Sequence, residues 1–286
     1  MSPPIQVRLP VMAFHHRRPS FRGPPLQPLR SGRLQLAHCP SRLVMYLWNL
    51  FTRKHKAVRR SGLEHRFVSM ETAHMVLGFG FDARSNDYKI VRILYLDDNR
   101  RGRKAQVEIY MLRTDRWRSS ECEVPSLCND SAVFLNGNLH WFEDGHGSIV
   151  LFDVAGEVFD KMAPPEEISH LDADANVLVM SLAVLNDLLA VYISFIDPVM
   201  DPEQHSICSV WVMGEYGVPE SWNKLYTFNP CGEVVGFDGF MRNGELLMEI
   251  YGGGRVSWNP ITGQYANFPH VTRCNLVTVV ESIVSL

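Results

Sequence analysis

The sequence contains no long hydrophobic run, although 46% of its 286 residues are hydrophobic. A helix needs roughly 20 consecutive apolar residues to cross a bilayer, so we expect no membrane-spanning helix. The N-terminus also lacks the short apolar segment that marks a secretory signal peptide. These absences favour a protein of the cytoplasm or the nucleus and predict no membrane partner.

Cysteine is scarce and irregularly spaced. The six cysteines form no Cys-x-x-Cys pair and show none of the Cys/His spacings that zinc sites use. Small secreted domains that depend on disulfides are much richer in cysteine. We therefore expect reduced, mostly buried thiols and no bound metal.

Motifs that carry catalysis are also missing. No Gly-x-Ser-x-Gly sequence occurs, and no residue close in sequence to His140 would orient it as a catalytic base, so we interpret His140 as a structural residue of a strand. The triplet Gly252-Gly253-Gly254 is not followed by a helix, so it predicts a turn between strands and no phosphate site. We assign no catalytic residue and no cofactor, and we predict that the chain is not an enzyme.

One acidic segment needs a separate interpretation. Residues 164–174 contain Glu166, Glu167, Asp172 and Asp174, and paired carboxylates catalyse glycoside hydrolysis. That mechanism requires one of the acids to lie in an apolar pocket, and this segment has little apolar content. Its proline and acid content instead predicts a solvated loop between strands.

Positive charge is concentrated at the N-terminal end. Residues 1–66 carry 13 Lys and Arg against a single acid, Glu64, although the whole chain has a net charge of -3. Eight of the 17 prolines lie within the first 40 residues, where they oppose helices, so residues 1–42 are predicted to form a disordered Arg/Pro-rich arm. The basic clusters suit nuclear import, but they lack the interleaved aromatics of nucleic-acid sites, so we predict no nucleic-acid partner.

From residue 43 onward the residue pattern is typical of β-strands joined by turns. Short apolar runs rich in Val, Ile, Phe, Tyr and Trp are separated by Asn, Asp, Gly and Pro, and helix signals are nearly absent. One recurring unit is an apolar strand, a turn and a second strand, with one aromatic anchor that we expect to be buried. The copies span 46–56, 78–93, 107–118, 149–162, 210–225 and 256–268, and their anchors are Trp48, Phe81, Tyr110, Phe152, Trp211 and Trp258.

A second recurring unit is a tight hairpin. Asn136-Gly137 and Asn243-Gly244 supply the two positive φ angles that a type I′ turn needs, whereas Asn186-Asp187 is a weaker signal. These turns are separated by about fifty residues, the length of a four-stranded kelch blade. Because one small sheet cannot bury both of its faces, such blades must stack on one another. The sequence therefore predicts an all-β fold, a complete or incomplete kelch-like β-propeller, over residues 43–286.

Several segments resemble the F-box-associated domain of plant F-box proteins, which is related to kelch repeats. The resemblance covers residues 43–268, and although each motif is weak alone, their order and spacing are specific. The segments are LWNLFTRKHK (47–56), GFGFDARSNDYKIVRI (78–93), VFLNGNLHW (133–141), VLFDVAGEVF (150–159) and VWVMGEYGVPESWNKLYTF (210–228).

The resemblance implies a protein-binding module of an SCF (cullin-RING) ubiquitin ligase, which acts in ubiquitin-dependent protein degradation. In that family an F-box docks on a Skp-type adaptor, and the C-terminal domain is thought to hold the substrate protein. In this sequence only Arg8-Leu9-Pro10-Val11 resembles the start of an F-box. The prolines between residues 19 and 28 oppose the helices that an F-box would form there. We therefore expect a missing or degenerate F-box, with adaptor and cullin as partners only where an F-box is present.

Loops on one face of the predicted propeller are the candidate binding site for a partner protein, because binding usually resides in loops on a rigid scaffold. The longest irregular segments are 97–105, 164–176 and 197–206. Two alternatives remain open: a carbohydrate-binding or glycoside-hydrolysing propeller, which would expose Trp beside acid pairs, and a non-functional truncated F-box remnant. The candidate partner-binding residues are Asp98, Arg101, Glu166, Asp172, Asp201 and Glu203.

Overall fold

The computed structural model describes residues 12–13, 45–49, 54–62, 74–98, 102–128, 132–144, 147–169, 176–196, 206–241, 243–252 and 254–268. Strands account for more than 40% of residues 43–268, in agreement with the predicted all-β fold. The described helices are a single turn, α2 (Glu166–Ser169), and a 3-10 turn, Pro219–Ser221. Neither has the length and apolar character that crossing a bilayer requires.

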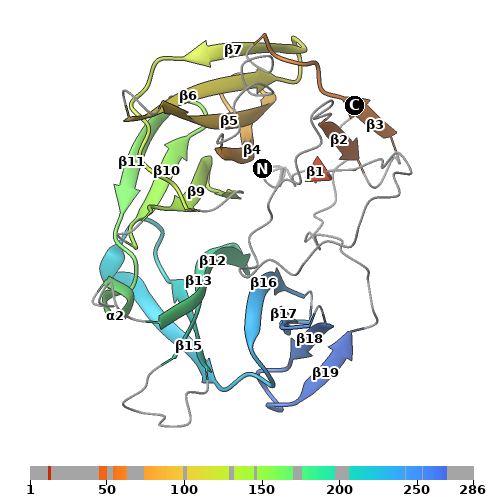
Figure 1. The fold of residues 1–286 in the computed structure, drawn as a ribbon, viewed down its shortest axis with the longest axis vertical. Coiled ribbons are helices and arrows are strands. Elements are labelled where there is room, and N and C mark those ends of the chain that lie inside the picture. The colour runs from red at the N-terminus through yellow and green to blue at the C-terminus, as the bar shows by residue number, and fades with distance from the viewer. Residues whose placement is uncertain are drawn as a thin grey trace, which may run out of the picture.

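Four four-stranded antiparallel sheets form the body of the molecule, and we number them blades I to IV (Figure 1). Blade I holds β4 (His74–Asp82), β5 (Asp87–Asp98), β6 (Gly102–Met111) and β7 (Arg116–Ser120). Blade II holds β8 (Val133–Leu135), β9 (Asn138–Phe142), β10 (Ile149–Asp153) and β11 (Val158–Met162). Blade III holds β12 (Asn176–Leu185), β13 (Leu188–Ile196), β14 (Ser206–Met213) and β15 (Trp222–Phe228). Blade IV holds β16 (Val234–Phe240), β17 (Leu246–Ile250), β18 (Gly254–Trp258) and β19 (Tyr265–Phe268).

A three-stranded sheet precedes blade I. It consists of β1 (Met12–Ala13), β2 (Tyr46–Asn49) and β3 (Lys54–Ala57), and we call it the N-terminal sheet. Met12 and Ala13 pair with Leu47 and Tyr46, so the disorder predicted for residues 1–42 does not extend to these two residues. They belong to a short apolar stretch without proline, which suits an added edge strand. The rest of that arm lies outside the described residues.

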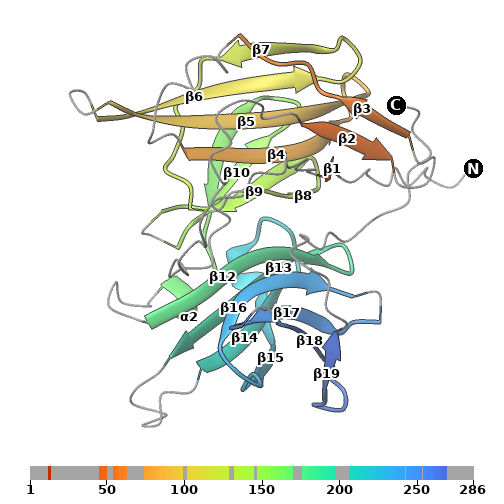
Figure 2. The ribbon, with the colours of Figure 1, turned by 45° about the vertical axis from the view of Figure 1, so that its right-hand side comes forward.

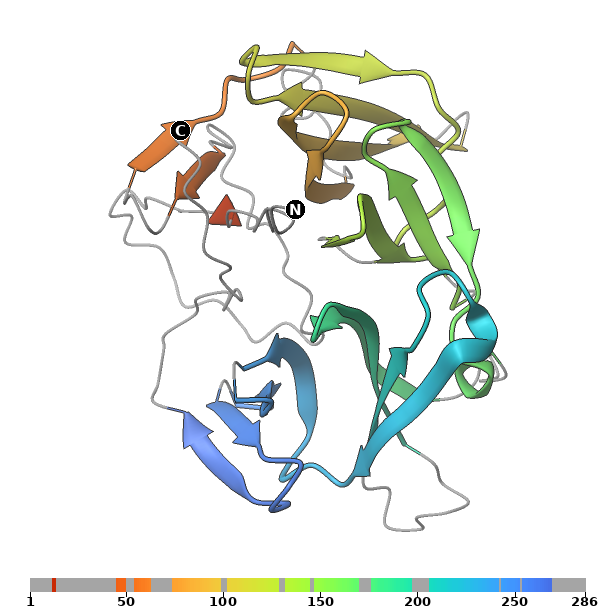
Figure 3. The same cartoon turned by 180° about the vertical axis from the view of Figure 1, so that it is seen from behind.

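The blades are arranged around a common centre, with their first strands innermost (Figures 1 and 3). Contacts between β12 and β16, between β12 and β8, and between β4 and β8 place these first strands together. Within each blade the strands follow one another as an up-and-down meander. This arrangement confirms the predicted all-β propeller fold.

The meander gives the propeller two faces with different connections. The turns between first and second strands and between third and fourth strands lie on one face, which we call the turn face. The connections between second and third strands, and those from one blade to the next, lie on the opposite face, the link face. In Figure 2 the link face lies to the left, where α2 is labelled.

Apolar side chains fill the spaces between neighbouring sheets. Side chains alternate between the two faces of a strand, so each blade contributes to two clusters. In β9, Leu139 and Trp141 pack toward blade I, whereas Phe142 packs toward blade III. Tyr110 belongs to the cluster against the N-terminal sheet, and Trp258 to the cluster between blades III and IV. Burial of each large apolar side chain stabilises the fold by roughly 2–3 kcal/mol.

Two glycines allow β4 to approach blade II closely. A Cβ atom on Gly78 would lie 2.5 Å from Leu139 Cδ1, and one on Gly80 would lie 2.6 Å from a ring carbon of Phe134. Both distances are shorter than real Cβ contacts, so a side chain at either position would push the blades apart. The Gly-Phe-Gly-Phe sequence of β4 is therefore a packing requirement of this interface.

The hairpin turns differ in part from the sequence prediction. Asn136 (φ 49°) and Gly137 (φ 83°) form the predicted two-residue turn with two positive φ angles. Asn186 (φ 51°) and Asp187 (φ 61°) do the same, although their sequence signal was weaker. At the third position Gly244 has a positive φ of 84°, its N–H donates to the Met241 carbonyl at 2.9 Å, and the Met241 N–H donates to the Glu245 carbonyl at 2.8 Å. The predicted type I′ turn at 243–244 is therefore wrong; a three-residue loop with a left-handed glycine replaces it.

The six copies of the first repeat unit occupy two kinds of position. Segments 107–118, 149–162, 210–225 and 256–268 form the outer hairpins of blades I to IV, and 46–56 forms the hairpin β2–β3. Segment 78–93 instead forms β4–β5, the inner hairpin of blade I. Among the anchors, Tyr110, Phe152, Trp211 and Trp258 are buried as predicted, Phe81 is half-buried, and the Trp48 side chain lies outside the described part.

Candidate functional site

The described ends of the three predicted binding segments lie on one face of the propeller. The β5–β6, β11–β12 and β13–β14 connections all lie on the link face, as the up-and-down topology requires. Asp98 ends β5 and pairs with Gly102, and Glu166 begins α2 with an exposed side chain. Arg101, Asp172, Asp201 and Glu203 lie outside the described residues, so their roles stay predictions.

The acidic segment after β11 is more ordered than the predicted solvated loop. It forms the single turn α2, and Ile168 packs into the cluster between blades II and III with 5% of its surface exposed. Glu166 and Glu167 remain exposed, and Glu167 accepts a charge-assisted hydrogen bond from Lys224. An open hollow of about 270 Å³ beside α2 is also bordered by Pro219. Neither carboxylate lies in the apolar pocket that a glycosidase acid requires.

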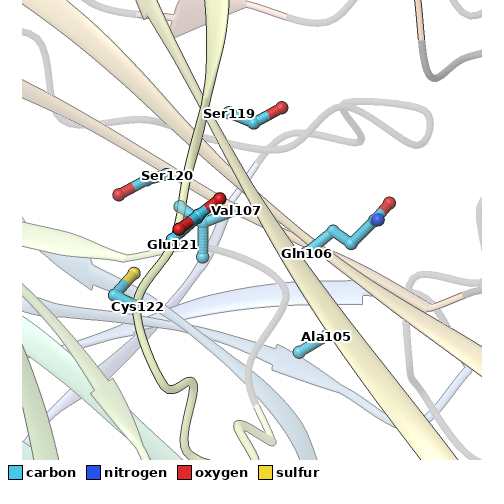
Figure 4. Close-up of a pocket in the computed structure, with 7 residues that line it drawn as sticks. All are labelled: Ala105, Gln106, Val107, Ser119, Ser120, Glu121 and Cys122. Carbon is cyan, nitrogen blue, oxygen red and sulfur yellow. The ribbon is translucent and has the colours of Figure 1, made fainter.

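A second hollow, of about 360 Å³, lies beside the outer edge of blade I (Figure 4). Gln106 and its neighbours in β6 line one side, and Ser119, Ser120, Glu121 and Cys122 line the other. Apart from Glu121 the lining is uncharged. The hollow brings together no nucleophile, base and orienting acid of the kind that catalysis needs.

The described tryptophan side chains pack inside the propeller. Of the five whose side chains the structure describes, Trp141, Trp211, Trp222 and Trp258 are buried and Trp117 is half-buried. The indole N–H of Trp141 donates to the Leu77 carbonyl, and that of Trp222 donates to the Ala163 carbonyl. A sugar-binding propeller would present tryptophan rings to solvent, and these described rings are not available for that purpose.

His140 is structural, as predicted, and its partners fix its tautomer. The ring is fully buried; Nδ1 lies 3.0 Å from the Val133 carbonyl, which can only accept, so Nδ1 carries the proton. Nε2 therefore accepts from the Tyr216 hydroxyl at 2.8 Å, and Asn138 Nδ2 donates to that hydroxyl at 3.0 Å. Burial lowers the pKa of His140 from 6.5 to about 4, against a raising effect of the Val133 carbonyl. We call these hydrogen bonds among Val133, His140, Tyr216 and Asn138 the neutral bridge between blades II and III.

A buried lysine forms a second connection, between blades I and II. Lys89 Nζ donates to Asp82 at 2.9 Å, to Glu157 at 2.8 Å and to the Val154 carbonyl at 2.8 Å, so its three N–H groups are all satisfied. Burial would raise the pKa of Asp82, but hydrogen bonds from Lys89, Ser85 and backbone amides outweigh it and lower the pKa to about 2. We call this group the charged bridge.

A third polar group joins blade I to the N-terminal sheet. Asp115, in the β6–β7 turn, accepts from the Tyr110 hydroxyl and pairs with Lys56 at 3.3 Å and with Arg59 at 2.8 Å. The Tyr110 hydrogen bond is the largest cause that lowers the pKa of Asp115. One carboxylate thus serves two cations that follow or belong to β3.

Metal and disulfide chemistry find no support in the described part of the chain. Its His, Cys, Asp and Glu side chains form no group of three that could hold a metal ion. Cys122, Cys128, Cys208 and Cys231 carry free thiols, of which Cys208 is buried and Cys231 is exposed. Burial raises the pKa of Cys208, which makes this thiol less reactive.

Sequence reasoning missed both bridges because their members are far apart in the chain. His140 and Tyr216 are separated by 76 residues, and Lys89 and Glu157 by 68. The sequence gives one partial indication of the charged bridge. Asp82 and Lys89 lie on either side of the turn in segment 78–93, and in the β4–β5 hairpin their side chains point to the same side of the sheet.

Comparison with known proteins identifies the family. The family model described as "F-box associated beta propeller domain" matches residues 38–249. The chain belongs to this F-box-associated propeller family. Its blades I to III lie wholly within the matched range, and part of blade IV does.

Curated relatives of this F-box-associated propeller come from Arabidopsis thaliana. The F-box protein CPR1 is 25% identical over 249 residues, covering 78% of this chain and 57% of CPR1. An F-box/kelch-repeat protein is 24% identical over 233 residues, covering 77% of this chain and 57% of that protein. The chain thus spans a little over half the length of the curated relatives it matches.

Among solved structures, the β-propeller domain of Cps50 (Swd1) from Myceliophteria thermophila aligns at a TM-score of 0.37 with 10% identity. The alignment covers 79% of this chain and 81% of that domain. At this TM-score the likeness supports no conclusion about blade number or function.

Proposed function

We propose that this propeller holds a substrate protein for a cullin-RING ubiquitin ligase of the SCF type, and that it catalyses no reaction itself. The observation that carries the proposal is the family match over residues 38–249, together with relatives that are named F-box proteins. In such a ligase the F-box would contact the Skp-type adaptor, and the propeller would contact the protein to be modified. The cytoplasm or the nucleus would be the site of action.

The geometry supports a role in binding proteins. Packed blades form a rigid body, and exposed connections on both faces can contact a large partner without moving the core. The described hollows are open and hold no convergent catalytic groups. The described tryptophans are engaged in packing and in hydrogen bonds, which disfavours a sugar-binding role.

Proximity labelling in plant cells, followed by direct binding, tests the proposal. The chain would carry a promiscuous biotin ligase, and each enriched protein would then be titrated against the purified chain by calorimetry. We expect at least one enriched protein to bind directly with a defined stoichiometry. A glycan array on the same sample is the control, and glycan binding without any direct protein partner would overturn the proposal.

A further inference from the structure

A positively charged surface covers the turn face of blade I and the residues next to it. It combines the end of β3 with the segment that follows it, the β4–β5 turn, the β6–β7 turn and the start of β7. Six of its seven cations are arginines. We call it the basic turn surface, and it consists of Lys56, Arg59, Arg60, Arg84, Arg113, Arg116 and Arg118.

Contacts between its segments show that the surface is continuous. Asp115 pairs with Arg59 and lies in the same turn as Arg113, whose backbone N–H donates to Asp87 at the start of β5. Asp82, at the other end of that β4–β5 turn, binds the backbone N–H of Arg84 at 2.9 Å. The four segments therefore form one surface rather than separate patches.

Among the described residues, the carboxylates that pair with Lys56, Arg59, Arg84 and Arg118 are fewer than these four cations and the buried Lys89 together. Asp115 serves both Lys56 and Arg59, and Asp153 pairs with Arg84 at 3.3 Å. Glu157 pairs with Arg118 but is also shared with the buried Lys89. Lys89 and Asp82 cancel each other. The single negative charge of Asp87 is smaller than the two positive charges of Arg113 and Arg116, so the described charges of the surface sum to a positive value.

Two arginines have no partner within the described part of the chain. Arg113 and Arg116 are exposed, and their guanidinium groups form no ion pair or hydrogen bond with the described residues. Arg113 lies in the same β6–β7 turn as Asp115, and Arg116 lies two residues before Arg118 in β7, the outermost strand of blade I. A guanidinium group binds carboxylates and phosphates through two parallel hydrogen bonds, so two unpaired arginines can receive anionic groups without breaking an existing pair.

The turns that carry the arginines are held in place by carboxylates. Asp82 accepts from the backbone N–H groups of Arg84 and Ser85, and Asp87 accepts from that of Arg113 at 3.0 Å. A surface whose backbone is already ordered loses little conformational entropy when it binds. The backbone that carries these arginines is therefore already ordered before a partner binds.

We propose that the basic turn surface binds an acidic peptide segment of the partner protein. This inference rests on the proposed role in substrate recognition and names the chemistry of the substrate. The anionic groups can be Asp and Glu carboxylates or phosphates on Ser and Thr, because arginine recognises both in the same geometry. The segment would be extended, since the surface crosses two turns, β4–β5 and β6–β7, and the segment after β3.

A nucleic acid fits this surface less well. Single-stranded nucleic acids bind basic grooves in which aromatic side chains stack on the bases. Two of the described aromatic residues lie beside the surface. Trp117 has its ring covered by the buried Arg92 guanidinium at 4.3 Å, and its N–H donates to the Arg59 carbonyl; Phe81 packs against Tyr88 with ring centroids 5.0 Å apart. Both rings are therefore engaged inside the protein, which favours a protein segment.

Fluorescence anisotropy on the purified full chain tests the proposal. The probes are a labelled peptide of glutamates alternating with Gly and Ser, the same peptide with phosphoserines, a lysine version, and a single-stranded oligonucleotide. We expect the acidic peptide to bind, the lysine version not to bind, and added salt to weaken binding because it screens exposed charges. Tighter binding of the phosphoserine peptide would assign phosphate as the anionic group, and equal binding would assign carboxylates.

Charge reversal locates the binding site. The double variant Arg113→Glu/Arg116→Glu should weaken acidic-peptide binding at least tenfold, and Arg113→Lys/Arg116→Lys should weaken it less. Lys161→Glu is the matched control, since this cation is 54% exposed on the edge strand of blade II, and should change binding less than twofold. Circular dichroism checks that every variant is folded.

Three outcomes would overturn the inference: no binding of either acidic peptide, equal binding by the double variant and the wild type, or tight binding of the oligonucleotide alone. The proposed function fails separately, if no protein partner binds the chain directly. A directly bound partner that the double variant binds as well as the wild type does would reject this surface and leave the recognition role standing.

Discussion

On one side of blade II, Glu157 and the Val154 carbonyl hold the ammonium group of Lys89 from blade I; on its other side, His140 accepts a hydrogen bond from Tyr216 of blade III. Both connections join neighbouring blades near the turn face. The charged bridge depends on a complete set of partners, because a buried charge without them is costly. The neutral bridge depends on one protonation state, because its histidine must accept at Nε2.

The largest expected effect comes from the aromatic anchors that fill the spaces between blades. Trp211→Ala, at the interface that the neutral bridge crosses, and Trp258→Ala, one interface further on, should each lower the free energy of unfolding by about 3–5 kcal/mol. Urea unfolding measures this. Tyr251→Ala is the control, since that ring is 76% exposed. Losses under about 1 kcal/mol would show exposed rings and revive the sugar-binding alternative.

Removing the cation should break the charged bridge. Lys89→Met leaves the carboxylates of Asp82 and Glu157 near each other without the ammonium group, which should lower the free energy of unfolding by about 3–5 kcal/mol. Lys161→Met removes a cation from an exposed pair with Glu143 and should cost at most about 1 kcal/mol. Equal losses in the two variants would contradict the difference between buried and exposed pairs.

Acid should break the neutral bridge first. The pKa of His140 is about 4 in the folded protein against 6.5 for the free side chain, so the unfolded chain binds more protons between these values. Stability is therefore fully present above pH 6.5 and falls as pH drops toward 4, by on the order of 3 kcal/mol. The charged bridge titrates lower, since the pKa of Asp82 is about 2.

The variant His140→Gln isolates this contribution. Its free energy of unfolding, measured at several pH values, should lose the part of the slope between pH 6.5 and 4 that His140 contributes. A slope identical to that of the wild type would show that another group titrates in this window.

The smallest expected effect concerns the hydroxyl at the centre of the neutral bridge. Tyr216→Phe leaves Nε2 of His140 without its donor and Asn138 with only one of its two acceptors, the Asn136 carbonyl, which should cost about 1–2 kcal/mol. Hydrogen exchange should accelerate in residues 214–218, the loop that Tyr216 attaches to blade II. Acceleration spread evenly over all blades would instead indicate global destabilisation.

Much of the fold could be predicted from the sequence, because each repeat contains local patterns that indicate strands, turns and buried aromatic residues. Asn136-Gly137 and the recurring aromatics marked hairpins and anchors before any contact was known. The sequence pattern grouped segment 78–93 with segments that form outer hairpins, but this segment forms an inner hairpin. Its turn, Ala83–Asn86, carries no Asn-Gly pair that would have marked it as one. The Asn186-Asp187 turn was underrated, since tertiary packing can hold two non-glycine residues at positive φ.

The site was less readable because its chemistry arises from contacts between blades. Glu166 was placed in a solvated loop, yet Ile168, two residues away, is drawn into the core and orders the segment into a helical turn. The basic turn surface also escaped prediction. Arg59, Arg84 and Arg113 lie in three separate connections between strands, and these connections become neighbours only in the folded propeller.

A quantitative proteomics experiment tests the central claim, that the propeller recognises a protein for degradation. An authentic F-box is joined in front of residue 43 and the fusion is expressed in plant cells, with the chain alone as the control. We predict that a small set of proteins falls in abundance with the fusion and recovers when the proteasome is inhibited, whereas the chain alone does not lower them. A folded, adaptor-bound fusion that lowers no protein would contradict the account.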